Sequence, residues 1–195
     1  SYNVANLLGV IAAMRAVGIA LDEAAEACRH LLPVPGRMEC LQAEGAPLVA
    51  VDYAHTPDAL DKALSALRLL AEQRGGRLWC VFGCGGDRDA TKRPLMAAVA
   101  ARGADRVVVT SDNPRGEKPE TIISQILLGL ADVPDVEVES DRARAIDAAV
   151  RQAGPADVIL LAGKGHETFQ EVAGVKHPFD DRVQAREAIA RRAGA

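Results

Sequence analysis

The sequence predicts an α/β fold in which a mostly parallel sheet is flanked by helices. Short apolar segments alternate along the chain with longer segments of helical periodicity, which is typical of strand–helix–strand units. The strand segments are almost continuously apolar, as expected when both faces of a parallel sheet are covered. Two helical segments come first, and the Pro- and Gly-rich stretch 33–37 separates them from the alternating part.

The chain opens on two predicted helices. The first spans 3–18 and ends at Gly18, a suitable C-cap, and the second spans 21–32 with acids in its first turn. The apolar positions of the first helix have helical spacing and are Val4, Leu7, Leu8, Ile11 and Met14. Because the chain begins inside a helix and not with Met, we expect it to be the C-terminal part of a longer protein.

The alternating part follows the break. The expected strands are 47–53, 77–83, 105–111, 136–140 and 157–163. The expected helices are 55–73, 91–104, 118–130, 141–154 and 181–193. Thr56 is a suitable N-cap with Pro57 at the first helical position, and 170–179 predicts a hairpin around Ala173 and Gly174. The order of elements predicts a Rossmann-like arrangement.

The composition excludes several classes of function. Of 195 residues, 49% are hydrophobic and 26% are charged, the balance of a globular protein. The net charge of −4 and the lack of a Lys/Arg run argue against nucleic acid binding. No signal peptide or bilayer-spanning apolar run is visible, so we expect no membrane partner.

Four cysteines occur without a C-x-x-C pair, at positions 28, 40, 80 and 84. This spacing is not that of a zinc site, and a disulfide framework is unusual at this chain length. We expect buried free thiols in a reducing cytoplasm.

Ligands of such sheets bind outside the carboxyl ends of the strands. The loops expected there begin at Asp52, Gly83, Ser111 and Gly163, and each is polar, glycine-bearing or both. Single polar loops are ordinary surface features. Four of them at one edge of the sheet predict a binding site.

Two glycine motifs resemble nucleotide loops without matching them. GCGGDRD has Arg88 where a dinucleotide loop needs its third glycine, so the motif is either a plain tight turn or a loop that brings Arg88 to an anionic group. In AGKGHE, Lys164 is followed by Gly165, so the chain has no G-x-x-x-x-G-K-[ST] loop. His166 can be a structural histidine and Glu167 a solvated acid in the first turn of a helix, or either can take part in ligand binding.

Two further motifs carry charge at strand ends. In VDYAHTPDA, Asp52 and His55 either make turn and cap contacts, or the Asp52 carboxylate binds a ribose hydroxyl with His55 beside it. In SDNPR, an Asn-Pro turn explains Asn113 and Pro114 but leaves Asp112 and Arg115 unused. An acid accepts from an ammonium and an arginine binds a carboxylate in bidentate fashion, so this last pair complements one amino-acid centre.

The stretches together resemble the Mur ligase family. They are YNVANLL, PGRME, VDYAHTPDAL, VFGCGGDRDATKRPLM, TSDNPR and LLAGKGHE, in the family's order from Tyr2 to Glu167. The resemblance implies that 35–195 is the C-terminal, amino-acid-binding domain of such a ligase. It implies that 1–34 holds the last helices of the central ATPase domain.

The resemblance also assigns site residues. DNPR resembles the motif of members that take meso-diaminopimelate, whose second carboxylate distinguishes it from lysine and would be bound by Arg115. The implied diaminopimelate contacts are Arg88, Asp112, Asn113, Pro114, Arg115, Gly163 and Glu167. The implied ATP contacts are Asn3, Asn6, Arg37, Asp52 and His55. No metal ligand and no catalytic residue is assigned.

The implied reaction is ATP-dependent amide formation with UDP-N-acetylmuramoyl-L-alanyl-D-glutamate in bacterial peptidoglycan synthesis. ATP and Mg²⁺ would serve the full-length enzyme, a cytoplasmic monomer, and none would bind tightly to this chain. Without a phosphate-binding loop we expect the chain alone to be inactive. Two alternatives stay open: a non-catalytic amino-acid-binding module of the same fold, and a nucleotide-binding oxidoreductase domain.

Overall fold

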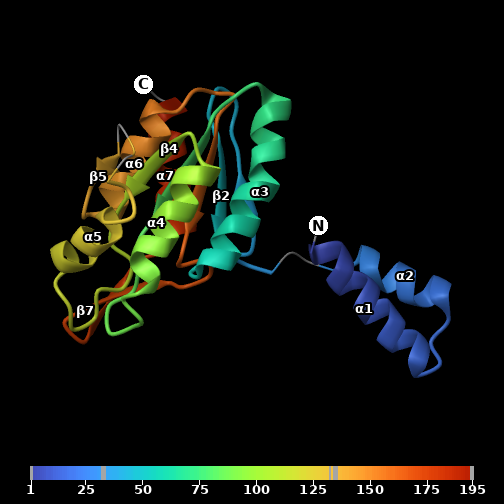
Figure 1. Cartoon of the computed structure of the whole chain (residues 1–195). Coiled ribbons are helices and arrows are strands. Elements are labelled where there is room, and N and C mark those ends of the chain that lie inside the picture. The colour runs from blue at the N-terminus through green and yellow to red at the C-terminus, as the bar shows by residue number, and fades with distance from the viewer. Residues whose placement is uncertain (1, 32–33, 132, 134–135, 194–195) are drawn as a thin grey trace. The chain divides into compact units, whose positions relative to one another are not determined.

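A computed structural model describes residues 2–31, 34–131, 133 and 136–193, with the side chains of 2–5 outside the description. Its contacts divide the chain into two compact units, Ser1–Val34 and Pro35–Ala195 (Figure 1). The division falls at the Pro- and Gly-rich break. The assignment of the first unit to an ATPase domain stays a prediction.

The first unit is a pair of helices, α1 (Tyr2–Ala16) and α2 (Leu21–Arg29), which pack against each other. Leu7, Ile11 and Met14 are half-buried, whereas Leu8 is exposed. The predicted helical periodicity is therefore confirmed at the three positions that share one face.

The second unit is built on a six-stranded sheet. Its strands are β1 (Glu39–Leu41), β2 (Leu48–Asp52), β3 (Leu78–Phe82), β4 (Arg106–Val109), β5 (Glu137–Val138) and β6 (Val158–Ala162). They lie in the order β1-β2-β6-β3-β4-β5, and every pairing is parallel except that of β1 with β2. The predicted mostly parallel sheet is confirmed.

Five helices cover the two faces of this sheet (Figure 1). They are α3 (Pro57–Arg74), α4 (Lys92–Gly103) and α5 (Pro119–Leu127) on one face, with α6 (Arg142–Gln152) and α7 (Asp181–Ala193) on the other. Successive strand residues point to opposite faces, so Phe82 packs toward the first three helices and Val81 toward the other two. Both residues are fully buried, which explains the unbroken apolar strands.

Local signals fix several element ends. Thr56 accepts a hydrogen bond from the Ala59 amide at 3.3 Å, and Gly75 closes α3 at φ +69°, where glycine has no steric penalty. The predicted hairpin forms as β7 (Phe169–Val172) and β8 (Val175–Pro178). Ala173 and Gly174 both have positive φ at its turn, which suits the twist of a two-residue loop.

Two predictions need correction. Strand β1 was not predicted, because three residues at the edge of a sheet carry too little periodicity to distinguish them from a linker. The cysteines are free as expected, but only Cys80 is buried, and Cys40 is exposed.

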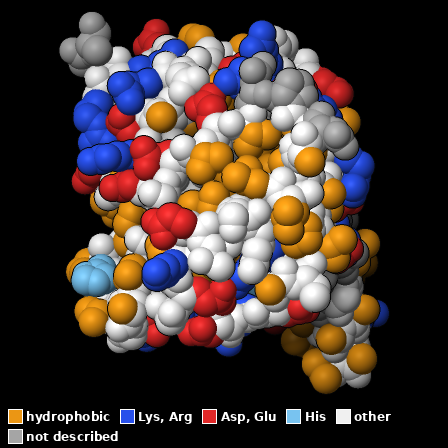
Figure 2. Space-filling model, turned by 60° about the vertical axis from the view of Figure 1, so that its left-hand side comes forward, with side chains coloured by type: hydrophobic (Ala, Val, Ile, Leu, Met, Phe, Trp, Pro, Cys, Tyr) orange, Lys and Arg blue, Asp and Glu red, His pale blue; other side chains and the backbone are white. Residues whose placement is uncertain are grey.

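None of the described helices combines the length and the apolar character that crossing a membrane requires. Figure 2 shows exposed hydrophobic side chains interspersed with charged ones on one face.

Candidate functional site

A cavity of about 380 Å³ opens where the parallel strands β2, β3, β4 and β6 present their carboxyl ends. The loops after all four strands contribute to its lining, together with α4. Six of the seven residues predicted to contact diaminopimelate line it: Arg88, Asp112, Asn113, Arg115, Gly163 and Glu167. Their roles as ligand contacts stay predictions. Pro114, the seventh, does not line the cavity.

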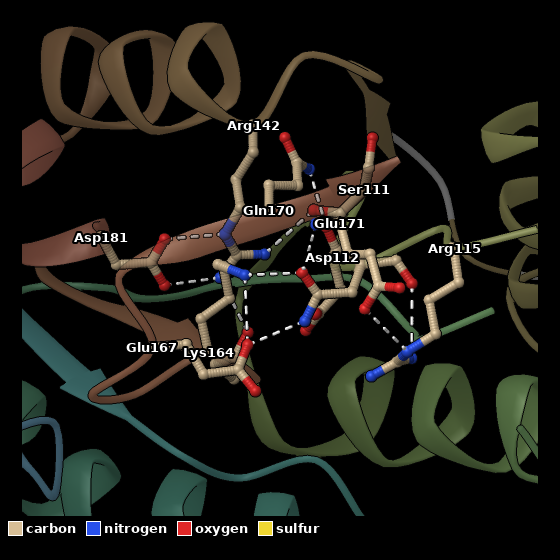
Figure 3. Close-up of polar contacts among 11 residues, drawn as sticks. Ser111, Asp112, Arg115, Arg142, Lys164, Glu167, Gln170, Glu171 and Asp181 are labelled. Atoms are coloured by element: carbon tan, nitrogen blue, oxygen red, sulfur yellow. Dashed lines mark hydrogen bonds and ion pairs between the residues drawn. The ribbon is translucent and has the colours of Figure 1, made fainter. Parts of the chain in front are cut away.

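Asn113 joins the loop after β4 to the loop after β6. Its amide nitrogen donates to Glu167 Oε2 at 2.8 Å, and its amide oxygen accepts from Lys164 Nζ and from the Glu171 amide, each at 3.0 Å. Lys164 Nζ also lies 3.2 Å from Glu167 Oε2 (Figure 3). The Lys164 side chain is fully buried, so its charge is balanced by Glu167 and not by solvent. These contacts fix the direction of the Glu167 carboxylate.

The hairpin strand β7 holds the backbone of the SDNPR loop. Gln170 Nε2 donates to the carbonyl of Asp112 at 2.7 Å, and the Arg115 amide donates to the carbonyl of Glu171 at 2.9 Å. Pro114 was implied to contact diaminopimelate by the resemblance alone. The hydrogen bonds to β7 hold the Arg115 backbone. The carbonyl of Pro114 accepts from the Glu117 amide at 3.0 Å, and Pro114 is not among the lining residues.

Asp112 is a buried carboxylate in the wall of the cavity. Asp112 is only 7% exposed, and this burial raises the pKa of its carboxyl group. Arg142 and Lys164 oppose that rise by their positive charge. Among the described residues, no hydrogen bond reaches the Asp112 carboxylate. Gly163 has φ +116°, and a Cβ there would overlap Asp112 Oδ2, so this position requires glycine.

Arg115 sits at φ +51°, an unusual conformation for a residue with a side chain. Its guanidinium donates to the carbonyl of Gly86 at 2.9 Å, and its Nε lies 3.7 Å from the carboxylate of Glu171. Asp112 and Arg115 both line the cavity, but the described contacts include no ion pair between them. The guanidinium therefore still has donors for an incoming carboxylate.

A further ion pair connects the glycine loop after β3 to the loop after β4. Arg93 is 1% exposed, donates to the carbonyl of Gly85 at 3.1 Å, and pairs with Glu117 at 2.7 and 2.9 Å. The Asp87 amide also donates to Glu117. The hydrogen bonds from Arg93 and Asp87 lower the pKa of Glu117 to about 2. Arg88 projects from this loop as an exposed residue of the lining.

The residues predicted to contact ATP are only partly brought together. The Arg37 guanidinium lies 4.9 Å from the centre of the Tyr53 ring, and the His55 ring lies 4.4 Å from it. Asp52 accepts from the Met38 amide at 2.9 Å, and burial raises the pKa of its carboxyl group. His55 lines the cavity, whereas Arg37 and Asp52 do not.

Asn6 belongs to α1 in the first unit, and the side chain of Asn3 lies outside the described part of the chain. In the part that the structure describes, no group of three His, Cys, Asp or Glu side chains could hold a metal ion.

Comparison of the sequence with protein families identifies the family to which this domain belongs. The model of the Mur ligase glutamate ligase domain matches residues 36–165. The chain belongs to the Mur ligase family.

Among curated Mur ligases, the UDP-N-acetylmuramoyl-L-alanyl-D-glutamate–2,6-diaminopimelate ligase of Acidovorax sp. (strain JS42) is 66% identical over 193 residues, which are 99% of this chain and 38% of that protein. The enzyme of the same name from Neisseria meningitidis serogroup A is 56% identical over 92% of this chain and 36% of its own length. The chain thus spans less than two fifths of these relatives.

Solved Mur ligase structures share the fold. A structure of UDP-N-acetylmuramoyl-L-alanyl-D-glutamate–2,6-diaminopimelate ligase is 42% identical and superposes with a TM-score of 0.75 over 98% of this chain and 39% of its own. The UDP-N-acetylmuramate-alanine ligase of Thermotoga maritima is 21% identical with a TM-score of 0.69, over 99% of this chain and 38% of its own, which is a likeness of fold.

Four residues outside the lining of this Mur ligase cavity were missed at the level of sequence. Lys164 and Glu171 bind the lining residue Asn113, and Arg142 and Asp181 form a buried ion pair with each other. Lys164 was noticed only as part of an incomplete phosphate loop. Arg142 and Asp181 are the first residues of two helices and resemble ordinary polar helix starts. A charged pair 39 positions apart has no periodic signal that could reveal it.

Proposed function

We propose that this chain is the C-terminal part of an ATP-dependent amide ligase that joins meso-diaminopimelate to UDP-N-acetylmuramoyl-L-alanyl-D-glutamate. In this proposal residues 35–195 bind the incoming amino acid, and 1–34 are the last two helices of the ATPase domain. The enzyme acts as a cytoplasmic monomer. The names of the 66% and 42% identical proteins support the reaction. One observation carries the role of this domain: the buried carboxylate of Asp112 faces the same cavity as Glu167 and Arg115.

The charges of the cavity complement one amino-acid centre. The Asp112 and Glu167 carboxylates accept from an ammonium, and the guanidinium of Arg115 donates to the carboxylate of that centre. Arg88, at the exposed rim, adds a second guanidinium. An ammonium held by carboxylates stays protonated and is not nucleophilic. The centre bound here is therefore the far one, and the amino group at the other end of diaminopimelate attacks.

The proposed reaction forms one bond and breaks one. The attacking nitrogen adds to the acyl phosphate made from the D-glutamate side chain. The tetrahedral adduct expels phosphate, the nitrogen releases a proton, and an amide remains. ATP would phosphorylate that side-chain carboxylate and leave as ADP, and Mg²⁺ would offset the charge of the phosphates. This domain contributes the position of the amine, because holding a nucleophile in line replaces a bimolecular encounter by a local one.

The nucleotide contacts of this chain are also a proposal. The donor set suits part of an ATP site, since Arg37 can pair with a phosphate and His55 stands at the cavity wall beside Tyr53. Asp52 retains acceptor capacity for a hydroxyl beyond the Met38 amide. Asn3 and Asn6 complete the proposed set.

The proposal is tested with Arg115→Ala in the full-length ligase. Loss of a charged hydrogen bond costs about 1.5–3 kcal/mol, so KM for meso-diaminopimelate should rise roughly 10- to 100-fold while KM for ATP stays within about twofold. Arg68→Ala is the matched control, because Arg68 pairs with Asp105 at the opposite edge of the sheet. Equal losses for both substrates in Arg115→Ala would contradict the proposed role.

A further inference from the structure

A buried ion pair stands directly behind the amino-acid cavity. Arg142 begins α6 and Asp181 begins α7, and both side chains are fully buried. The guanidinium binds the carboxylate through two hydrogen bonds, from Nε at 2.8 Å and from a terminal nitrogen at 2.7 Å (Figure 3). Neither residue lines the cavity, so neither touches a ligand bound there.

The remaining donors of Arg142 reach the backbone where the site begins. One terminal nitrogen donates to the carbonyl of Ser111 at 3.3 Å, and the other donates to the carbonyl of Ala162 at 3.0 Å. These carbonyls immediately precede Asp112 and Gly163. A single guanidinium thus links the ends of β4 and β6 at the two peptides that carry lining residues into the cavity.

The separation of those two peptides is tightly set. A Cβ on Gly163 would overlap the Asp112 carboxylate, so the two residues are already at their closest approach. A small shift of either strand end would move that carboxylate relative to Glu167, which is anchored by Lys164 on the same loop as Gly163. Misplacement of about 1 Å can cost roughly 100-fold in a positioned reaction.

A gain in folding stability does not explain the presence of this buried ion pair. Removing two charges from water costs several kcal/mol per ion, and replacing a buried pair by apolar side chains is often neutral or stabilising. We propose that Arg142, oriented by Asp181, is a positioning residue that fixes the Asp112 and Gly163 backbones for amino-acid binding. This inference rests on the proposed function.

The pair also acts on the charge of Asp112. Arg142 favours the ionised carboxylate and Asp181 disfavours it. The charged or titratable groups that face Asp112 come from four elements and are Arg142, Lys164, Glu167, Asp181 and the Cys84 thiol. Removing Arg142 should therefore raise the pKa of Asp112, and removing the charge of Asp181 should lower it.

The test uses the full-length ligase with the double variant Arg142→Met/Asp181→Leu, the single variant Arg142→Lys and the control Arg68→Met. Both site variants should unfold within a few degrees of wild type, with KM for meso-diaminopimelate raised roughly 10- to 100-fold and KM for ATP within about twofold. The control should keep both KM values. If the double variant does not fold, the KM values of Arg142→Lys test the inference, because this variant keeps the positive charge but lacks the planar guanidinium.

A second readout separates positioning from mere folding. The acid limb of kcat/KM for diaminopimelate against pH should move to higher pH in Arg142→Met and to lower pH in Asp181→Asn. Folded site variants with the wild-type KM, or limbs that move in the same direction, overturn the inference. If the wild-type ligase does not use diaminopimelate at all, the proposed function fails first, and the two failures are distinguishable.

Discussion

Replacing Asp112 by Asn should weaken amino-acid binding and stabilise the free protein. The carboxylate is buried at 7% exposure, and burial raises its pKa, so the fold disfavours its ionised form. An acid whose pKa is raised by folding lowers stability once the pH exceeds its unfolded pKa. The isosteric amide removes this cost, because no hydrogen bond to the carboxylate is lost among the described residues.

The expected size of the change differs between the stability of the free protein and the KM for diaminopimelate. Each kcal/mol regained should raise the Tm of the domain that holds Asp112 by roughly 2–4 °C, the value for a folding unit of 150–250 residues, and the gain should vanish below about pH 3.8, where both states are protonated. Loss of a charge-assisted hydrogen bond to the ammonium costs about 1.5–3 kcal/mol, which is roughly a 10- to 100-fold rise in KM for diaminopimelate.

The assay is a thermal scan of the ligand-free full-length ligase together with steady-state kinetics. Asp105→Asn is the matched control, because Asp105 pairs with Arg68 and accepts from the Leu78 amide, each at 2.7 Å, and its pKa is lowered. That variant should lose stability and keep its KM. A lower Tm and an unchanged KM for Asp112→Asn would refute the reasoning.

Three further predictions follow from the same loops. Gly163→Ala should cost about 1–3 kcal/mol of stability and raise KM for diaminopimelate in the full-length ligase, since its methyl group would displace the Asp112 carboxylate; a thermal scan that matches wild type would contradict this. Glu117→Gln should lower Tm at pH 7, and the difference should shrink as the pH falls from 4.5 through about 2, the pKa set by Arg93; a pH-independent difference would contradict it. Cys84, whose pKa burial raises to about 12, should resist iodoacetamide at pH 8, as mass spectrometry can check; rapid labelling of the native protein would contradict this.

The sequence predicted those parts of the fold that rest on local pattern. Continuous apolar strands between helices of clear periodicity indicated the parallel sheet, and its carboxyl edge then placed Arg88, Asp112 and Glu167 at one cavity. The edge strand β1 escaped because three residues give no periodicity.

The buried contacts that hold the lining residues in place could not be predicted from local sequence patterns. Arg142 and Asp181 are far apart in sequence, and either would serve equally well as a solvated helix start until the fold buries both. Lys164 and Asn113 are 51 positions apart, so their hydrogen bond exists only after β4 and β6 are arranged in one sheet. The hydrogen bonds between β7 and the Arg115 backbone could not be predicted either, because they join segments that are far apart in the sequence.

The most direct test of the central claim compares meso-diaminopimelate and L-lysine as substrates of the full-length ligase. Lysine lacks the carboxylate that Arg115 would bind, and a site built for a polar group can reject the analogue without it by up to roughly 10⁴-fold. We predict that kcat/KM for diaminopimelate exceeds that for lysine by at least roughly 100-fold and that Arg115→Ala narrows this ratio. Comparable kcat/KM values for the two amino acids in the wild-type enzyme would contradict the account.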